Sequence, residues 1–185
     1  MKKHSVFTPF FALICVLSAL PLCALNVSQA VEKRNDLELC SRPSGGCDLP
    51  AKKFAPYELG FRLPRKLAAN VLYQSVPFYA VILRHEAQPE CDGGEFTRDM
   101  ESFRRQSQKL FPTRKVFADH QCPDMNAVSY AVQKKPGSNN WSEAFVAVYA
   151  GRTPQEANRV LNFAKARFPG ATMRRLRVGY SRVVQ

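Results

Sequence analysis

Two stretches, FTRDMESFRRQSQKLFPTRKVFADH (residues 96–120) and TPQEANRVLNFAKARFPGATMRRLRV (residues 153–178), repeat one pattern. Each reads as an amphipathic helix, then Phe-Pro, then a strand. An apolar run of strand length precedes each of them, at residues 78–83 and 144–150. The repeat predicts an α+β fold, a ferredoxin-like βαββαβ sandwich whose four-stranded antiparallel sheet carries two helices on one face.

The second helix has the clearest start signal in the chain. Thr153 stands where an N-cap is expected, and Glu156 follows at the spacing of a capping box. Residues 127–133 alternate weakly ahead of a turn-rich segment. They are expected to form a hairpin with the strand at residues 144–150, or to prolong the strand at residues 115–120 past a kink.

Residues 1–30 have the organisation of a secretory signal peptide. Two lysines precede an apolar run at residues 10–20, and Ser28-Gln29-Ala30 offers small residues for cleavage. A membrane anchor is the alternative, but the run is shorter than the roughly 20 residues of a spanning helix. We therefore expect an exported chain, periplasmic or secreted after cleavage, with no integral membrane span.

The rest of the chain is basic. Cleavage after residue 30 leaves 25 Lys and Arg against 15 Asp and Glu, a formal net charge of +10. Outside the cytoplasm this charge favours cell-wall polymer, membrane headgroups or an acidic protein as the partner. Nucleic acid is not expected, since the strands also lack the aromatic motif of RNA-binding sheets.

Four cysteines remain after cleavage, an even count that favours two disulfides in an exported chain. A glycine-rich loop joins Cys40 to Cys47, and we expect these two to pair. The loops that carry Cys91 and Cys122 follow parallel strands in the predicted topology, so they meet at one end of the sheet and a second disulfide is expected there. The spacing matches no zinc-binding thiolate motif.

Residues 31–75 lack sustained periodicity and are rich in turn formers. They are expected to be a mostly irregular arm, in which residues 65–73 could hold two helical turns, ahead of a domain at residues 76–185.

The segment FVAVYAGRTPQEANRVLNFAKARFPGATMRRLR, residues 145–177, resembles the second half of the sporulation-related repeat, the SPOR domain. The matching features are Tyr149-Ala150-Gly151 and the capped helix start at residues 153–157. The resemblance covers residues 78–180 and is stronger in the second half. It implies the duplicated βαββαβ order and binding to peptidoglycan glycan strands, across the sheet face away from the helices, in a bacterial envelope.

On that open face the sequence offers aromatic and arginine side chains, which suit sugar rings and their polar groups. Strict alternation places Phe145 and Tyr149 there, and it places Leu176 and Val178 toward the helices. The expected ligand-binding set is Tyr79, Phe145, Tyr149, Arg175 and Arg177.

Two alternatives stay open. In the first, the arm covers the sheet, and the basic surface of the first helix docks an acidic envelope partner. The basic set on this helix is Arg98, Arg104, Arg105 and Lys109. In the second, a metal-assisted enzyme uses His85, Glu86, Asp119 and His120 at the ends of the two parallel strands. The chain has none of the common hydrolase, metalloprotease or phosphate-loop motifs, so catalysis, a metal and a cofactor are not expected.

Overall fold

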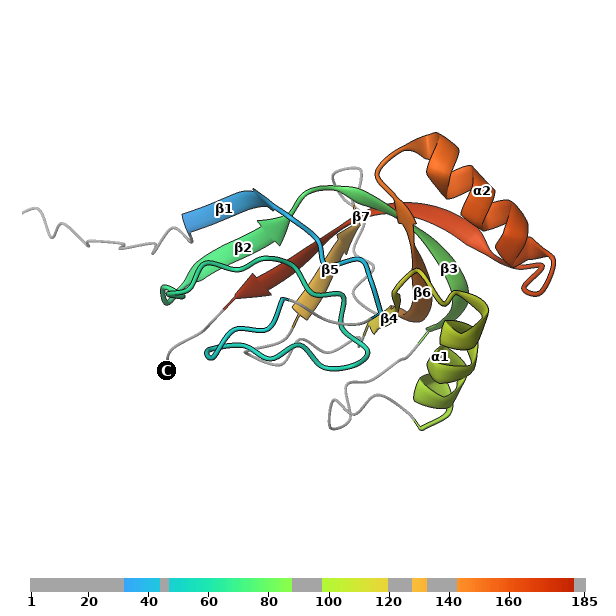
Figure 1. Cartoon of the computed structure of the whole chain (residues 1–185), viewed down its shortest axis with the longest axis horizontal. Coiled ribbons are helices and arrows are strands. Elements are labelled where there is room, and N and C mark those ends of the chain that lie inside the picture. The colour runs from blue at the N-terminus through green and yellow to red at the C-terminus, as the bar shows by residue number, and fades with distance from the viewer. Residues whose placement is uncertain (1–31, 44–46, 88–97, 120–127, 133–142, 182–185) are drawn as a thin grey trace, which may run out of the picture. The chain divides into compact units, whose positions relative to one another are not determined.

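The computed structural model describes residues 32–43, 47–87, 98–119, 128–132 and 143–181, which Figure 1 draws as ribbons. They form strands and two helices in the order β1 (Glu32–Leu37), β2 (Val71–Ser75), β3 (Phe78–Ala87), α1 (Arg98–Leu110), β4 (Val116–Asp119), β5 (Val128–Val132), β6 (Glu143–Gly151), α2 (Pro154–Lys165) and β7 (Thr172–Ser181).

The strands form one sheet in the order β1-β2-β7-β3-β6-β4, and β5 also pairs with β7. β3 pairs with the first half of β7 and β2 with its end, so β2 and β3 follow β7 as one line interrupted at Val76-Pro77. β5 pairs with residues 176–180 of β7, and it therefore lies along the opposite edge of β7. β1 is parallel to β2, and the other pairings are antiparallel.

The predicted four-stranded ferredoxin-like sandwich is wrong, because the sheet has seven strands and curls into a half-barrel. Residues 31–75, expected to be irregular, supply two of the extra strands, β1 and β2. The third is β5, which pairs with β7 and does not form the predicted hairpin with β6. The strands expected from the repeat are β3, β4, β6 and β7, and they lie within this larger sheet.

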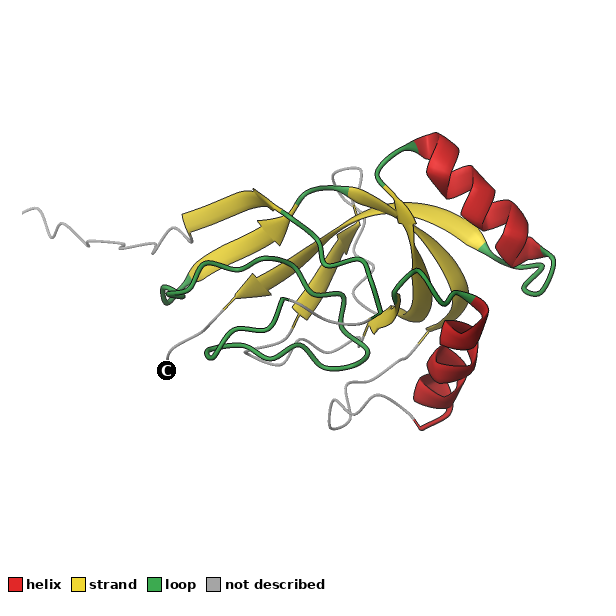
Figure 2. Cartoon of the chain, in the orientation of Figure 1, coloured by secondary structure: helices red, strands yellow, loops and turns green. Residues whose placement is uncertain are grey.

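The loop between β1 and β2 fills the interior face of the curled sheet (Figure 2). We call residues 38–70 the β1–β2 loop. Its Leu59 and Phe61 are fully buried and belong to one apolar cluster with Phe78, Phe117 and other residues of the strands. Backbone hydrogen bonds also join the loop to the β4 region, from Ala118 N to Tyr57 O and from Lys115 N to Ser41 O, both at 2.9 Å. The loop is therefore part of the hydrophobic core.

The predicted disulfide between Cys40 and Cys47 is confirmed, with Cα atoms 6.1 Å apart. It closes a short loop within the β1–β2 loop, next to Gly60, whose carbonyl accepts a hydrogen bond from Cys40 N at 2.9 Å. The second predicted pair, Cys91 and Cys122, lies outside the described residues.

Both helices pack on the outer face of the sheet, opposite the β1–β2 loop. They contact β3, β4, β6 and β7 (Figure 1). The helix residues that are buried in this second apolar cluster are Met100, Ala157, Val160 and Ala164, and they meet Val81, Val146 and Val148 of the sheet. The two layers place the sheet between the helices and the β1–β2 loop, so β3 and β6 have buried residues on both faces.

The predicted start of α2 is confirmed. Thr153 caps the helix, accepting a hydrogen bond from Glu156 N at 3.3 Å, and the Glu156 carboxylate accepts one from Thr153 N at 3.2 Å. The turn before it requires glycine, because Gly151 has φ +108° and a Cβ atom there would lie 2.7 Å from Glu156 Cβ. Hydrogen bonds from Arg152 N, at 3.0 Å, and from Thr153 N lower the pKa of the Glu156 carboxyl.

Candidate functional site

The predicted ligand-binding residues on β6 face the interior of the half-barrel. Phe145 is buried, 3% exposed, and its ring lies 6.2 Å from Phe117 and 5.9 Å from Tyr130. Tyr149 is half-buried, with its ring 5.8 Å from that of Phe78. Burial raises the pKa of Tyr149. The interior face that was expected to be open to a glycan is thus occupied by the β1–β2 loop.

The other three predicted ligand residues lie on the outer face or at its margin. Tyr79 and Arg175 are direct cross-strand partners, Tyr79 packing against the helix-side cluster and Arg175 being exposed. The Arg177 guanidinium donates hydrogen bonds to Asp36 Oδ1 at 3.0 Å and to Ser75 O at 2.8 Å. Arg177 therefore holds β1 and β2 to β7. The structure does not bring the five predicted residues together.

The cause is the facing of β7. Leu176 and Val178 were expected to face the helices, but they lie in the interior cluster with Phe61 and Phe145. The sequence predicted correctly which residues of β7 alternate, but it assigned the apolar set to the wrong face of the sheet. The interior face is the more deeply buried one along the C-terminal half of this strand, so Leu176 and Val178 lie there. Arg175 and Arg177, which alternate with these residues, are consequently directed to the outer face.

The predicted metal residues are only partly described. His85 on β3 and Asp119 on β4 both pair with Phe145, one from each side of β6. Burial raises the pKa of Asp119 well above its usual value. His120 lies outside the described residues, and among the residues that are described no three metal-ligating side chains gather.

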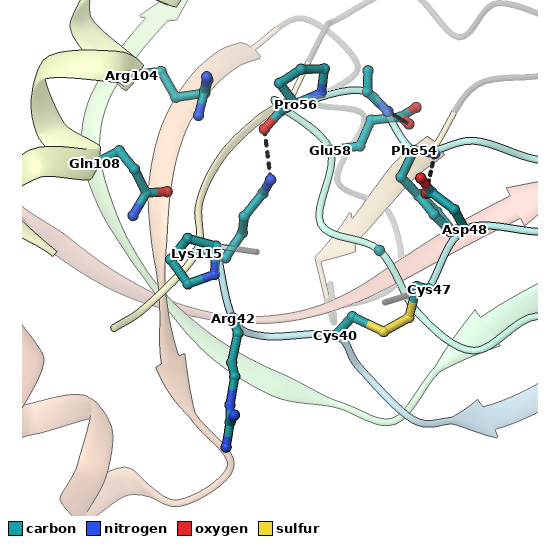
Figure 3. Close-up of a pocket in the computed structure, with 13 residues that line it drawn as sticks. Cys40, Arg42, Cys47, Asp48, Phe54, Pro56, Glu58, Arg104, Gln108 and Lys115 are labelled. Atoms are coloured by element: carbon teal, nitrogen blue, oxygen red, sulfur yellow. Dashed lines mark hydrogen bonds between the residues drawn. A yellow bond between two sulfur atoms is a disulfide. The ribbon is translucent and has the colours of Figure 1, made fainter. Parts of the chain in front are cut away.

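A pocket of about 390 Å³ opens between the β1–β2 loop and the outer helix α1 (Figure 3). Arg104 and Gln108 of α1 form one wall, Lys115 lies on the segment that leads into β4, and the Cys40–Cys47 disulfide borders the opposite side. The pocket therefore forms where the loop, the helix and the sheet edge meet.

Apart from Arg42, which is exposed, its charged groups are bonded within the fold. Lys115 Nζ donates to Pro56 O at 2.7 Å, and burial followed by the nearby Arg104 charge lowers the pKa of Lys115. Glu58 forms an ion pair with Lys52 at 2.9 Å, and Asp48 Oδ1 accepts a hydrogen bond from Phe54 N at 2.9 Å.

Arg104 is buried, and its donors are also bonded within the fold. Its Nε and Nη2 donate to the two Glu101 oxygens at 2.6 and 2.7 Å, and its Nη1 donates to Val116 O at 3.3 Å. The hydrogen bond from Arg104 lowers the pKa of Glu101. The described residues that line the pocket include no His, Ser, Thr or free thiol.

The most distinctive surface feature is a segregation of charge around the helices. Residues 102–115 and 157–168 contain eight basic and no acidic residues. Four of these cations are exposed and make no ion pair with any described residue: Lys109, Arg159, Lys165 and Arg167. Only Lys109 belongs to the basic set singled out from the sequence. The absence of acids from both windows is the signal that could have located the others.

The same surface carries the exposed apolar residues. Among the described residues, Leu110 at 38% and Phe163 at 57% are the exposed large hydrophobic side chains. Phe163 lies where the two helices meet, since its ring is 5.4 Å from that of Phe111, and Leu110 is the residue before Phe111 at the end of α1. We call Leu110, Phe163 and the four exposed cations the basic seam.

No helix of the described part of the chain combines the length and apolarity that crossing a membrane requires. No family model, curated protein or solved structure matches the chain, so its resemblance to the SPOR domain stays an expectation from sequence.

Proposed function

We propose that the protein is an exported, non-catalytic binding module that engages an anionic component of the cell envelope through the basic seam. The observation that carries the proposal is the charge segregation: eight basic and no acidic residues in the two windows that build this surface. A field of one sign attracts an oppositely charged surface at long range and orients the encounter.

The arrangement of the core supports this choice of surface. The interior face is filled by the β1–β2 loop, with Leu59 and Phe61 fully buried, so a polymer has no access there without unfolding the loop. The pocket beside α1 has its charges bonded internally apart from Arg42. The seam, by contrast, combines exposed cations with exposed apolar side chains.

A second candidate function is binding of peptidoglycan glycan strands, favoured by the cross-strand pair of Tyr79 and Arg175. Arg175 is exposed, and Tyr79 lies directly beside it on the outer face. An aromatic ring next to a guanidinium suits a sugar ring and its carboxylate or hydroxyl groups. In this version the ligand lies on β3 and β7, away from the seam.

Sedimentation with three envelope fractions tests both candidates. The protein expressed from its full chain is mixed with purified sacculi, envelope vesicles and soluble envelope extract, at low and high salt. The seam proposal predicts salt-sensitive retention that Arg159→Glu with Arg167→Glu removes. The glycan candidate predicts retention by sacculi that Arg175→Ala weakens and the seam variant spares. Retention by none of the fractions would refute both.

A further inference from the structure

We infer that the basic seam is a peripheral membrane-binding surface, whose Phe163 and Leu110 side chains enter the interface of an anionic phospholipid bilayer while the surrounding cations contact the headgroup phosphates. This inference rests on the proposed function and specifies its anionic component.

The first argument is the spacing on α2. Arg159 precedes Phe163 by four residues, and Arg167 follows it by four, in the turn that ends the helix. Residues four apart lie on one side of a helix, so both arginines flank the exposed ring. Long cationic side chains beside an inserted aromatic are able to keep their charged ends at the headgroup level.

The second argument is the space beneath the patch. Phe111 is 5% exposed, and its ring meets that of Phe163 edge to face at 5.4 Å and 77°. Phe111 therefore fills the gap below Phe163, and the patch presents side chains outward. An outward apolar patch suits insertion into a soft interface better than it suits capture of a partner's side chain.

The third argument is charge complementarity. Arg159 and Arg167 flank Phe163, and Lys109 directly precedes Leu110, with no acidic residue in either window. Lys165, two residues after Phe163, lies on another side of α2. The acids that border the two windows, Glu101 and Glu156, lie in the first turns of α1 and α2. Glu101 is bonded to Arg104 and Arg105, and the Glu156 carboxylate accepts hydrogen bonds from Arg152 N and Thr153 N. Each cation close to an anionic bilayer strengthens binding by about fivefold.

Vesicle flotation tests the inference, using vesicles of phosphatidylglycerol and phosphatidylethanolamine beside vesicles of phosphatidylcholine alone. The full chain is expected to float with the anionic vesicles and to be released by salt. Phe163→Ala should weaken this binding about tenfold, and Arg159→Gln with Arg167→Gln about twentyfold or more. Arg65→Gln with Lys66→Gln removes the same charge from exposed positions of the β1–β2 loop and serves as the matched control.

The outcomes separate the inference from the proposed function. Absence of binding to anionic vesicles overturns the inference, and so does equal weakening by the seam and control variants. Failure with vesicles together with seam-dependent retention by sacculi or by an acidic protein would leave the proposed function standing. Failure with vesicles and with every envelope fraction would overturn both.

Discussion

Replacing Phe61 by Ala tests whether the β1–β2 loop belongs to the core. Phe61 is fully buried, it packs in the interior cluster, and its ring lies 5.9 Å from that of Phe54. Removing a buried phenyl ring loses its transfer free energy and leaves a cavity, which together cost about 3–5 kcal/mol. For a domain of this size each kcal/mol lowers the melting temperature by about 2–4 °C, so a fall of roughly 10 °C is expected.

Urea unfolding followed by far-UV circular dichroism measures the change, and Phe163→Ala is the matched control. It deletes the same ring from a site that is 57% exposed, so its cost should stay below about 1 kcal/mol. If Phe61→Ala cost no more than the control, the β1–β2 loop would be a detachable cover, and the interior face would be accessible to a ligand.

Three further changes have distinct expected results in the same unfolding assay. Glu101→Gln should cost about 2 kcal/mol because it weakens the acceptors of a buried guanidinium, whereas Arg105→Gln should cost under about 0.5 kcal/mol because the Arg105 side chain is itself 72% exposed; equal costs would contradict this. Burial raises the pKa of Asp119 above 3.8, so ionisation of this carboxyl destabilises the fold as pH rises. Asp119→Asn should therefore have a larger free energy of unfolding than the native chain at pH 7, and a difference between the two that did not shrink toward pH 4 would contradict the reasoning. Serine at both Cys40 and Cys47 should cost about 2.5 kcal/mol, given the short loop they close, and no loss would contradict it.

Local signals in the sequence correctly predicted the start and end of α2 and the disulfide between Cys40 and Cys47. The capping box fixed the start of α2, and Phe168-Pro169 marked the stop before β7. The Cys40–Cys47 bridge followed from a short glycine-rich spacing. These features depend on neighbours within a few residues, which is why a single sequence contains enough information to place them.

Features that depend on distant partners were missed. β2 is five residues long and finds its partner about a hundred residues later in β7, so nothing local distinguishes it from a loop. β5 was expected either to form a hairpin with the strand that follows it or to prolong the strand before it, but it pairs with β7. The side of the sheet on which Arg175 lies was also predicted wrongly, because it depends on which layer, the helices or the β1–β2 loop, covers each face of the sheet.

The pairing of β2 with β7 has a consequence for the order in which the fold is completed. The N-terminal strands cannot complete their hydrogen-bonded pairing before β7 is present, because β7 joins β2, β3 and β5 in one sheet. A chain that emerges from its N-terminus, through a ribosome or a translocation channel, has no complete core until residues near Ser181 arrive. Truncation before β7 should consequently abolish the whole structure, a dependence that suits a protein delivered across a membrane in an extended state.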